Sequence, residues 1–282
     1  MGVLIVVGIL VLVGLGIWYS WYAKKKRREE LAIAAKQLGL QYSADDVFGC
    51  LALPFGLLRK GDGRGTENVL WGTWQGLDLR EFDYWYYDET TDSEGHTSRS
   101  YSHFSCAVTQ VQLTAAELSV TRENIFTRFA DHVGLRDIEF ESEQFNREFN
   151  VKSGDRKFAN DVLDARMMQW LMETEGGFAF EMNGPYVLTY CKRLRPVELT
   201  PLLGVLKGYV DHVPKVAYSY YGDPAKAAEL YSGVPQAHGE AQPAGPGQSQ
   251  PAPPPGAAPA PDLPPPPAGP APPSSPGGSF PP

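Results

Sequence analysis

Charged side chains are missing from the first 22 residues of this 282-residue chain, and proline is scarce until its last 48 residues. Six prolines are spread over residues 1–234, and the other 19 lie in residues 235–282. A uniform globular chain is therefore excluded. Between an uncharged start and a proline-rich end lies a middle of about 200 residues, which is long enough for one core of ordinary size or two small ones.

Cysteine and basic residues are also few, and each shortage argues against a class of site or partner. The three cysteines, Cys50, Cys106 and Cys191, are odd in number and lack C-x-x-C spacing. We therefore expect buried thiols in a reducing compartment, not disulfides or metal ligands. Residues 31–234 hold 20 basic and 29 acidic side chains. Because a nucleic-acid-binding surface needs an excess of cations, nucleic acid is not an expected partner.

Catalytic and cofactor motifs are absent from the sequence. It has no P-loop, no G-x-S-x-G nucleophile elbow and no two histidines four residues apart. A Ser-His-Asp arrangement could be drawn only by free choice of residues, which is no evidence. The sequence thus predicts no cofactor, no metal site and no recognisable enzyme class.

An apolar run fills the start of the chain. Residues 3–22 would span about 30 Å as a helix, which matches the hydrocarbon thickness of a bilayer. The one strongly polar side chain in this run is Ser20. The sequence therefore predicts a transmembrane anchor that contacts the lipid bilayer through residues 3–22. A cleaved signal peptide is the alternative, but the run ends in large aromatic and basic residues and not in a small-residue cleavage site.

Amphipathic rings end the apolar run, and five consecutive basic residues follow it. Trp and Tyr rings favour the boundary between hydrocarbon and headgroups, and cations directly after a span favour the cytoplasmic side. The positive-inside rule therefore predicts a single-pass protein of the plasma (inner) membrane, with its N-terminus outside and the bulk of the chain cytoplasmic. The predicted membrane-interface residues are Trp18, Tyr19, Trp21, Tyr22, Lys24, Lys25, Lys26, Arg27 and Arg28.

The middle of the chain carries strand patterns early and helix patterns late, which predicts an α+β fold: an antiparallel sheet with helices on one face. A juxtamembrane helix ends at Gly39, and a three-stranded meander follows with a hairpin turn at Gln75-Gly76. The other predicted elements are a loop over 88–102, strands at 104–113, 137–141 and 149–151, a helix over 155–175, a hairpin over 178–190, and a helix that begins at Thr200 and ends before Pro214.

The end of the chain is too poor in apolar side chains to fold. Residues 235–282 contain one aromatic residue and two acidic ones, so a disordered Pro-rich tail with polyproline II character is expected. We interpret it as a spacer, with a groove-binding ligand as the alternative. The predicted segments are 1–23, transmembrane anchor; 24–44, basic flank and juxtamembrane helix; 45–218, α+β domain; 219–234, linker with a short helix; and 235–282, tail.

Two carboxylates alternate with large apolar residues on one predicted strand. Glu81 and Asp83 share a strand face with Leu79 and Trp85. We expect that face to be solvated. The alternative is that both carboxylates are buried near aromatic rings with raised pKa values, as an acid–base pair would require. Glu81 and Asp83 are therefore the candidate catalytic residues.

Several short motifs resemble a family of uncharacterised, actinobacterial-like membrane-anchored proteins that share a domain of unknown function. The resemblance covers residues 30–214 and implies a membrane-associated bacterial protein without supplying catalytic residues. The residues that carry it are Phe82-Asp83-Tyr84, Ile138-x-Phe140-Glu141-Ser142, Phe145-Asn146-x-x-Phe149-x-Val151, and Asp155-x-x-x-Ala159.

Three functions are compatible with these patterns. The first is a non-catalytic module, held at the cytoplasmic membrane face, that binds a protein or lipid partner. The second is an unrecognised membrane-associated enzyme that uses Glu81 and Asp83 as paired carboxylates. The third is a cell-envelope protein whose domain lies outside the membrane. The first is preferred because the anchor is clear and catalytic motifs are absent.

Overall fold

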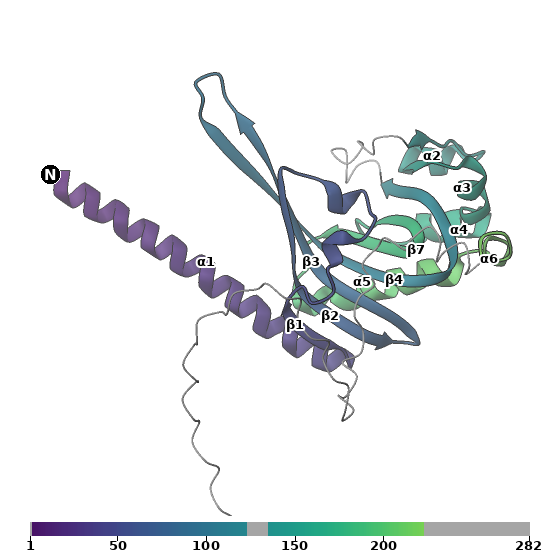
Figure 1. The fold of residues 1–282 in the computed structure, drawn as a ribbon, viewed down its shortest axis with the longest axis horizontal. Coiled ribbons are helices and arrows are strands. Elements are labelled where there is room, and N and C mark those ends of the chain that lie inside the picture. The colour runs from purple at the N-terminus through teal and green to yellow at the C-terminus, as the bar shows by residue number, and fades with distance from the viewer. Residues whose placement is uncertain (1, 123–134, 223–282) are drawn as a thin grey trace, which may run out of the picture. The chain divides into compact units, whose positions relative to one another are not determined.

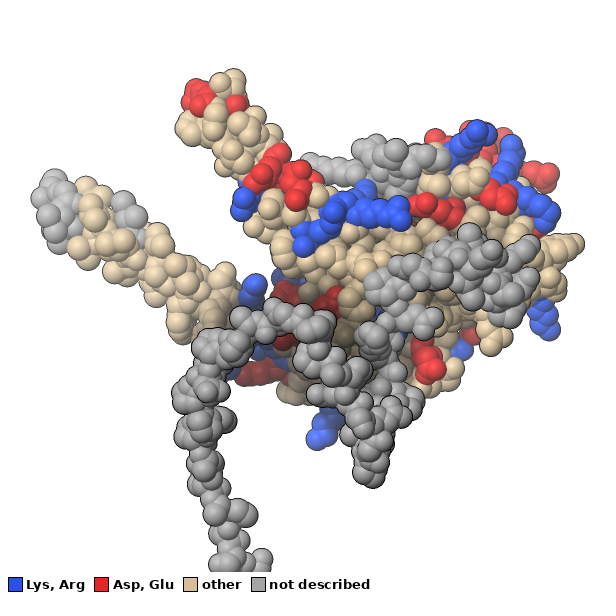
Figure 2. Space-filling view, in the orientation of Figure 1, with Lys and Arg blue, Asp and Glu red and all other residues tan. Residues whose placement is uncertain are grey.

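The computed structural model describes residues 2–122 and 135–222 (Figure 1). Its first element, α1 (Gly2–Leu38), is one continuous helix of 37 residues, so the apolar run and the juxtamembrane helix form a single rod. Gly39 ends it with a φ of +72°, a left-handed conformation that is common after a helix C-terminus. Among the described residues, α1 is the one helix long and apolar enough to cross a membrane. Figure 2 shows its projecting part without charged side chains.

A seven-stranded antiparallel sheet forms the rest of the framework. Its strand order is β1-β2-β3-β4-β6-β5, and β7 also pairs with β4. β4 is the longest strand, and it lies between β3 and β7 over part of its length and between β6 and β7 near its end. The strands are β1 (Gln41–Asp45), β2 (Gly63–Trp74), β3 (Leu77–Thr91), β4 (Thr97–Arg122), β5 (Arg136–Asp137), β6 (Phe149–Ser153) and β7 (Ala179–Lys192).

The predicted turn between β2 and β3 is confirmed, whereas the predicted loop after β3 is wrong. Gln75 and Gly76 both have positive φ angles, as a two-residue hairpin turn requires. Most of residues 88–102 are paired strand, with the ladder continuing to Thr91 opposite Thr97. Thr, Ser and Tyr pair well in strands without being buried, so a polar composition did not mean a loop here. Figure 1 shows this hairpin extending beyond the remaining strands.

The second predicted hairpin is also wrong, because β7 is a single strand of 14 residues. Asn183-Gly184-Pro185 bends the strand without reversing it. The mismatch is taken up by β4, which uses five steps from Gln110 to Ala115 where β7 uses two. Such bulges accommodate a proline, which has no N–H to offer the ladder.

Helices cover one face of the sheet, as predicted, with two local differences. The helix expected over 155–175 is broken after Val162, because Asp164 caps a second helix by accepting a hydrogen bond from the Met167 N–H. The strand expected over 137–141 is limited to Arg136–Asp137. The helices are α2 (Glu143–Glu148), α3 (Arg156–Val162), α4 (Ala165–Glu173), α5 (Leu199–His212) and α6 (Lys215–Tyr221).

The sheet buries an apolar core on each face. On the helix face, Leu31 and Ala35 of α1 join residues from α3, α4 and α5. On the opposite face, two short 3₁₀ turns, Cys50–Ala52 and Leu57–Arg59, cover aromatic residues of β3, β4 and β7. All three cysteines are free and buried, as expected. The predicted tail, 235–282, and residues 223–234 of the predicted linker lie outside the described residues.

Candidate functional site

The last turns of α1 are built into the sheet. Leu31 and Ala35 are buried against it, while the apolar side chains described between Ile5 and Tyr22 are exposed. One helix therefore changes from a surface suited to lipid to a surface suited to a protein core. Arg27 lies at this change, five residues after Tyr22, or about 8 Å along the helix axis.

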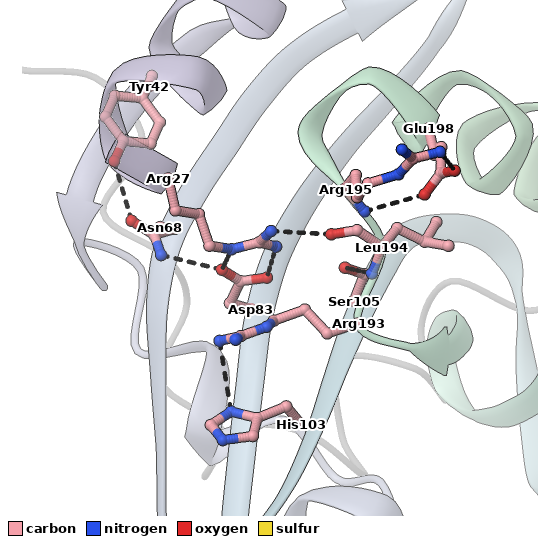
Figure 3. Close-up of polar contacts among 10 residues, drawn as sticks. All are labelled: Arg27, Tyr42, Asn68, Asp83, His103, Ser105, Arg193, Leu194, Arg195 and Glu198. Carbon is pink, nitrogen blue, oxygen red and sulfur yellow. Dashed lines mark hydrogen bonds and ion pairs between the residues drawn. The ribbon is translucent and has the colours of Figure 1, made fainter. Parts of the chain in front are cut away.

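Arg27 forms the central contact of this junction with Asp83 of β3 (Figure 3). Its Nε donates to Asp83 Oδ2 at 2.7 Å, and its Nη2 donates to Oδ1 at 2.5 Å. Its Nη1 donates to the Leu194 carbonyl at 2.8 Å. The Arg27 side chain is 15% exposed and that of Asp83 is 3% exposed. This is a bidentate, largely buried ion pair, the geometry in which a guanidinium binds a carboxylate most specifically.

Burial by itself would lower the pKa of Arg27, but the hydrogen bond and the charge of Asp83 outweigh it and raise that pKa. The Arg27 guanidinium therefore stays charged. Because both charges have left water, each depends on the other, and removing either would leave a buried charge without its partner.

Two polar side chains extend the contact on the β2 side. Asn68 Nδ2 donates to Asp83 Oδ2 at 2.9 Å, and the Tyr42 hydroxyl donates to Asn68 Oδ1 at 2.9 Å. Asn68 has a φ of +58° and lies where the β2–β3 register shifts, so a bulge aims its amide at Asp83. On the other side, Ser105 Oγ accepts a hydrogen bond from the Leu194 N–H and holds the carbonyl that Arg27 uses. We call Arg27, Tyr42, Asn68, Asp83 and Ser105 the junction cluster.

The expectation that Glu81 and Asp83 lie on a solvated face is wrong. Glu81 is 1% exposed and Asp83 is 2% exposed, and Arg27 of α1 lies against the Asp83 carboxylate. The alternation of acidic and apolar residues is typical of a strand with one solvent-exposed face. Nothing local in the sequence indicates that a helix from the start of the chain lies against the acidic face. Of the acid–base alternative, the structure bears out the burial of both carboxylates and the raised pKa of Glu81.

The two carboxyl groups differ in their surroundings. Asp83 is bound by Arg27 and Asn68, whereas neither oxygen of Glu81 has a hydrogen-bond partner among the described residues. Burial, and secondarily the negative charge of Asp83, raise the pKa of Glu81 well above its usual value. Burial in an apolar site thus favours the protonated form of Glu81 over the charged one.

Replacing Glu81 by Met is expected to stabilise the protein. The substitution keeps the side-chain length and removes two unpartnered buried oxygens, so we expect the free energy of unfolding at neutral pH to rise by about 1–2 kcal/mol. Thermal unfolding of the full chain in detergent micelles would measure this. Glu81→Gln is the matched control, because it keeps an unpartnered polar group and should bring no such gain. Destabilisation by Met would contradict this account of Glu81.

Arg27 differs in its surroundings from the other predicted membrane-interface residues. The side chains of Lys24, Lys25 and Lys26 are exposed, as are the rings of the four aromatic residues before them. Arg28 lies 4.0 Å from Glu67 of β2. Arg27 instead binds the sheet, a role that only the folded chain reveals. Contact of the remaining residues with lipid headgroups stays a prediction.

A third buried carboxylate, Glu181 of β7, was missed by the sequence reasoning. It lies on the opposite face of the sheet, 3% exposed, where Oε2 accepts from the Gly56 N–H at 2.6 Å and Oε1 from the Leu57 N–H at 3.1 Å. Burial raises its pKa to about 7 although these hydrogen bonds oppose the rise. The sequence signal for this buried carboxylate is a single acidic residue inside the otherwise apolar stretch 178–182.

Both candidate catalytic acids lie inside the fold. Asp83 is fully engaged by its partners, and Glu81 is closed off from solvent, so neither is presented to a substrate. Within residues 2–122 and 135–222, no group of three or more His, Cys, Asp or Glu side chains is placed to hold a metal ion. The junction cluster links α1 to the sheet through a buried ion pair and hydrogen bonds.

Comparison with known proteins adds a distant likeness in fold. No protein-family model matches the chain, and no curated protein matches it. The chain is similar to the crystal structure of the mycobacterial trehalose monomycolate transport factor A, TtfA, with a TM-score of 0.50 and 12% sequence identity. The match covers 67% of this chain and 96% of that one. At this identity, what the two proteins share is the fold.

Proposed function

We propose that this protein is a membrane-anchored, non-catalytic module that holds its α+β domain against the cytoplasmic face of the plasma membrane and binds a partner there, as an accessory factor in lipid transport. The observation that carries the proposal is the continuity of α1, which passes from an apolar, span-length segment into the core of the sheet and is held there by Arg27 and Asp83. A flexible tether would need no such contact.

Rigid coupling is useful when a domain must keep one height and one orientation above a membrane. Arg27 follows Tyr22 by five residues, so the sheet begins about 8 Å beyond the end of the apolar run. A partner in or on the same membrane would meet the same domain surface each time. The assignment to lipid transport rests on the likeness in fold to TtfA, whose name describes it as a transport factor.

The orientation can be tested with single cysteines, because the three native thiols are buried. Ser98→Cys places a thiol on the exposed β3–β4 hairpin, and Gly2→Cys places one before the span. A membrane-impermeant maleimide should label Ser98→Cys only in permeabilised cells and Gly2→Cys in intact cells. The reverse pattern would establish the third reading, in which the domain lies outside.

The enzyme alternative can be separated from the module by Glu81→Gln. This variant keeps the size of the side chain and abolishes its acid–base chemistry, while the junction cluster stays intact. In a deletion strain with a lipid-export or envelope defect, we expect Glu81→Gln to restore the phenotype fully. A folded Glu81→Gln protein that fails to restore it would overturn the non-catalytic proposal.

A further inference from the structure

Four aromatic rings lie together on one face of the β3–β4 hairpin, beside the junction cluster. Trp85 and Tyr87 of β3 pair with His103 and Tyr101 of β4, so the four side chains share one face of the sheet. Neighbouring ring centres are 5.3 to 6.4 Å apart. Tyr101 is 53% exposed, and the other three residues are half-buried. We call Trp85, Tyr87, Tyr101 and His103 the aromatic platform.

The aromatic platform lies flat against the sheet because β2 has glycines beneath it. A methyl group on Gly65 would lie 2.9 Å from the ring of Trp85, and one on Gly63 would overlap the ring of Tyr87. The guanidinium of Arg99 lies 4.7 Å over the Tyr87 ring. Within residues 2–122 and 135–222, nothing buries these rings fully. The result is a broad layer of rings that remains partly open to its surroundings.

Each ring of the aromatic platform combines an apolar body with a polar atom. Tryptophan and tyrosine are enriched where the hydrocarbon of a bilayer meets its headgroups, because the apolar part leaves water while the polar atom stays hydrated. The same two residue types end the apolar run of α1, at Trp18, Tyr19, Trp21 and Tyr22. The composition of the aromatic platform therefore suits the interface of a membrane.

α1 leaves the sheet next to these rings. Asp83, which binds Arg27, precedes Trp85 by two residues on the same strand face. Burial lowers the pKa of His103, and the charges of Arg193 and of Lys24, three residues before Arg27, lower it further. Figure 1 shows the hairpin and the projecting part of α1 leaving the sheet on the same side. The aromatic platform thus lies on the side of the domain from which the apolar run extends.

The aromatic platform and the end of the apolar run are at similar distances from the ion pair. Tyr22 lies about 8 Å from Arg27 along the helix axis. Trp85 and Tyr87 lie about 7 Å and about 13 Å from Asp83 along β3. A bilayer that surrounds the span therefore brings its headgroup layer to the level of these rings.

We propose that the aromatic platform is a second membrane contact, which lies in the headgroup layer of the bilayer that α1 crosses. Its rings, and not attraction to anionic lipid, would hold it there, because Glu89 pairs with Arg99 and the hairpin turn carries the acidic residues Asp92 and Glu94. A contact to one side of α1 limits how the domain tilts about the helix. This inference rests on the membrane anchoring in the proposed function, and not on a role in lipid transport.

Spin labels at two neighbouring positions of β4 test the proposal, because Tyr101 and Ser100 lie at the same height and point to opposite faces. The full chain, labelled at Tyr101→Cys or at Ser100→Cys, is reconstituted in phosphatidylcholine nanodiscs, and the three native thiols are buried. Electron paramagnetic resonance then compares collisions with oxygen, which concentrates in lipid, and with a water-soluble nickel chelate. We expect the oxygen-to-nickel ratio to be about threefold or more higher at Tyr101→Cys, because the interface shields that face from the chelate.

Two further labels separate this inference from the anchor. Leu12→Cys, inside the apolar run, should give the highest ratio, and Glu175→Cys, at an exposed position before β7, the lowest. A lipid value at Leu12→Cys with equal values at Tyr101→Cys and Ser100→Cys would overturn the second contact and leave the anchor standing. A water value at Leu12→Cys would overturn both. A Tyr101→Cys label shielded from both reagents would indicate a protein occupant, such as a second copy, and would also overturn the proposal.

Removing the rings gives an independent check. With the label at Tyr101→Cys, the combination of Trp85→Ser and Tyr87→Ser should lower the ratio to about the Ser100→Cys value, because the apolar area that enters the interface is lost. Tyr220→Ser removes a ring that is 65% exposed elsewhere and should leave the ratio unchanged. The comparison of Tyr101→Cys with Ser100→Cys needs neither variant, so it decides the matter even where loss of two rings disturbs the sheet.

Discussion

Replacing Asp83 by Ala should lower the free energy of unfolding by about 3 kcal/mol and loosen α1 from the sheet. The substitution leaves the buried guanidinium of Arg27 with one carbonyl partner and deprives Asn68 of its acceptor. Breaking a buried ion pair from one side costs more than the pair contributes, because the remaining charge stays desolvated. Denaturant unfolding of the full chain in micelles, followed by near-ultraviolet circular dichroism, would measure the loss.

The pair between Arg28 and Glu67 provides a matched control. Glu67 lies directly across from Asp83 on the neighbouring strand, and its pair also joins α1 to the sheet. That pair is 4.0 Å long and more exposed, so Glu67→Ala should cost less than about 1 kcal/mol. The double variant of Arg27→Ala with Asp83→Ala should be less destabilised than the sum of the single variants. Equal effects of Asp83→Ala and Glu67→Ala would mean that the junction is not held as described.

Stability should fall as the pH rises from about 4.5 to about 7, and Glu181 should account for a large part of the change. Its pKa is raised from 4.5 to about 7 by burial. Below pH 4.5 it is protonated in both the folded and the unfolded chain. Between the two pKa values only the folded chain retains the proton, so the free energy of unfolding falls by about 3 kcal/mol in total at 1.36 kcal/mol per unit, and it levels off above pH 7.

Glu181→Gln should remove this contribution, because the amide cannot ionise. The difference in unfolding free energy between the variant and the natural protein should therefore change by about 3 kcal/mol between pH 4.5 and pH 8, in favour of the variant at the higher pH. Glu175→Gln, at an exposed position, makes the same charge change and should leave the pH profile in place. A parallel shift of the whole Glu181→Gln curve would show that this carboxyl does not titrate in the range.

Much of the local structure followed from local pattern. The β2–β3 turn is specified by Gln75-Gly76, and the end of α1 by Gly39, because each of these conformations depends on residues adjacent in the chain. The failures occurred where a distant strand decided the outcome. Asn183-Gly184-Pro185 has turn chemistry, yet β7 continues through it because β4 supplies a bulge on the opposite side. Within the polar stretch 88–102, residues 88–91 and 97–102 form strand because they pair across the hairpin.

The sequence likewise predicted only part of the candidate site. Glu81 and Asp83 were recognisable as an unusual pair of acids, but their burial depends on a helix that begins near the start of the chain and crosses the sheet. The basic run after the apolar segment indicated a membrane flank. Which of its five cations turns inward is decided by the helical phase of α1 relative to β3, a relation between residues 56 positions apart.

By itself the sequence determined the division into an apolar, span-length helix, an acidic α+β domain and a proline-rich end, because composition and periodicity act over short stretches of chain. It also determined that few cysteines and few cations would be available for redox or nucleic-acid chemistry. Only the tertiary structure decided that Arg27 binds Asp83 and that Glu81 is buried without a hydrogen-bond partner among the described residues. The physical reason is that burial and ion pairing are properties of surfaces that meet, and these surfaces come from segments far apart in the chain.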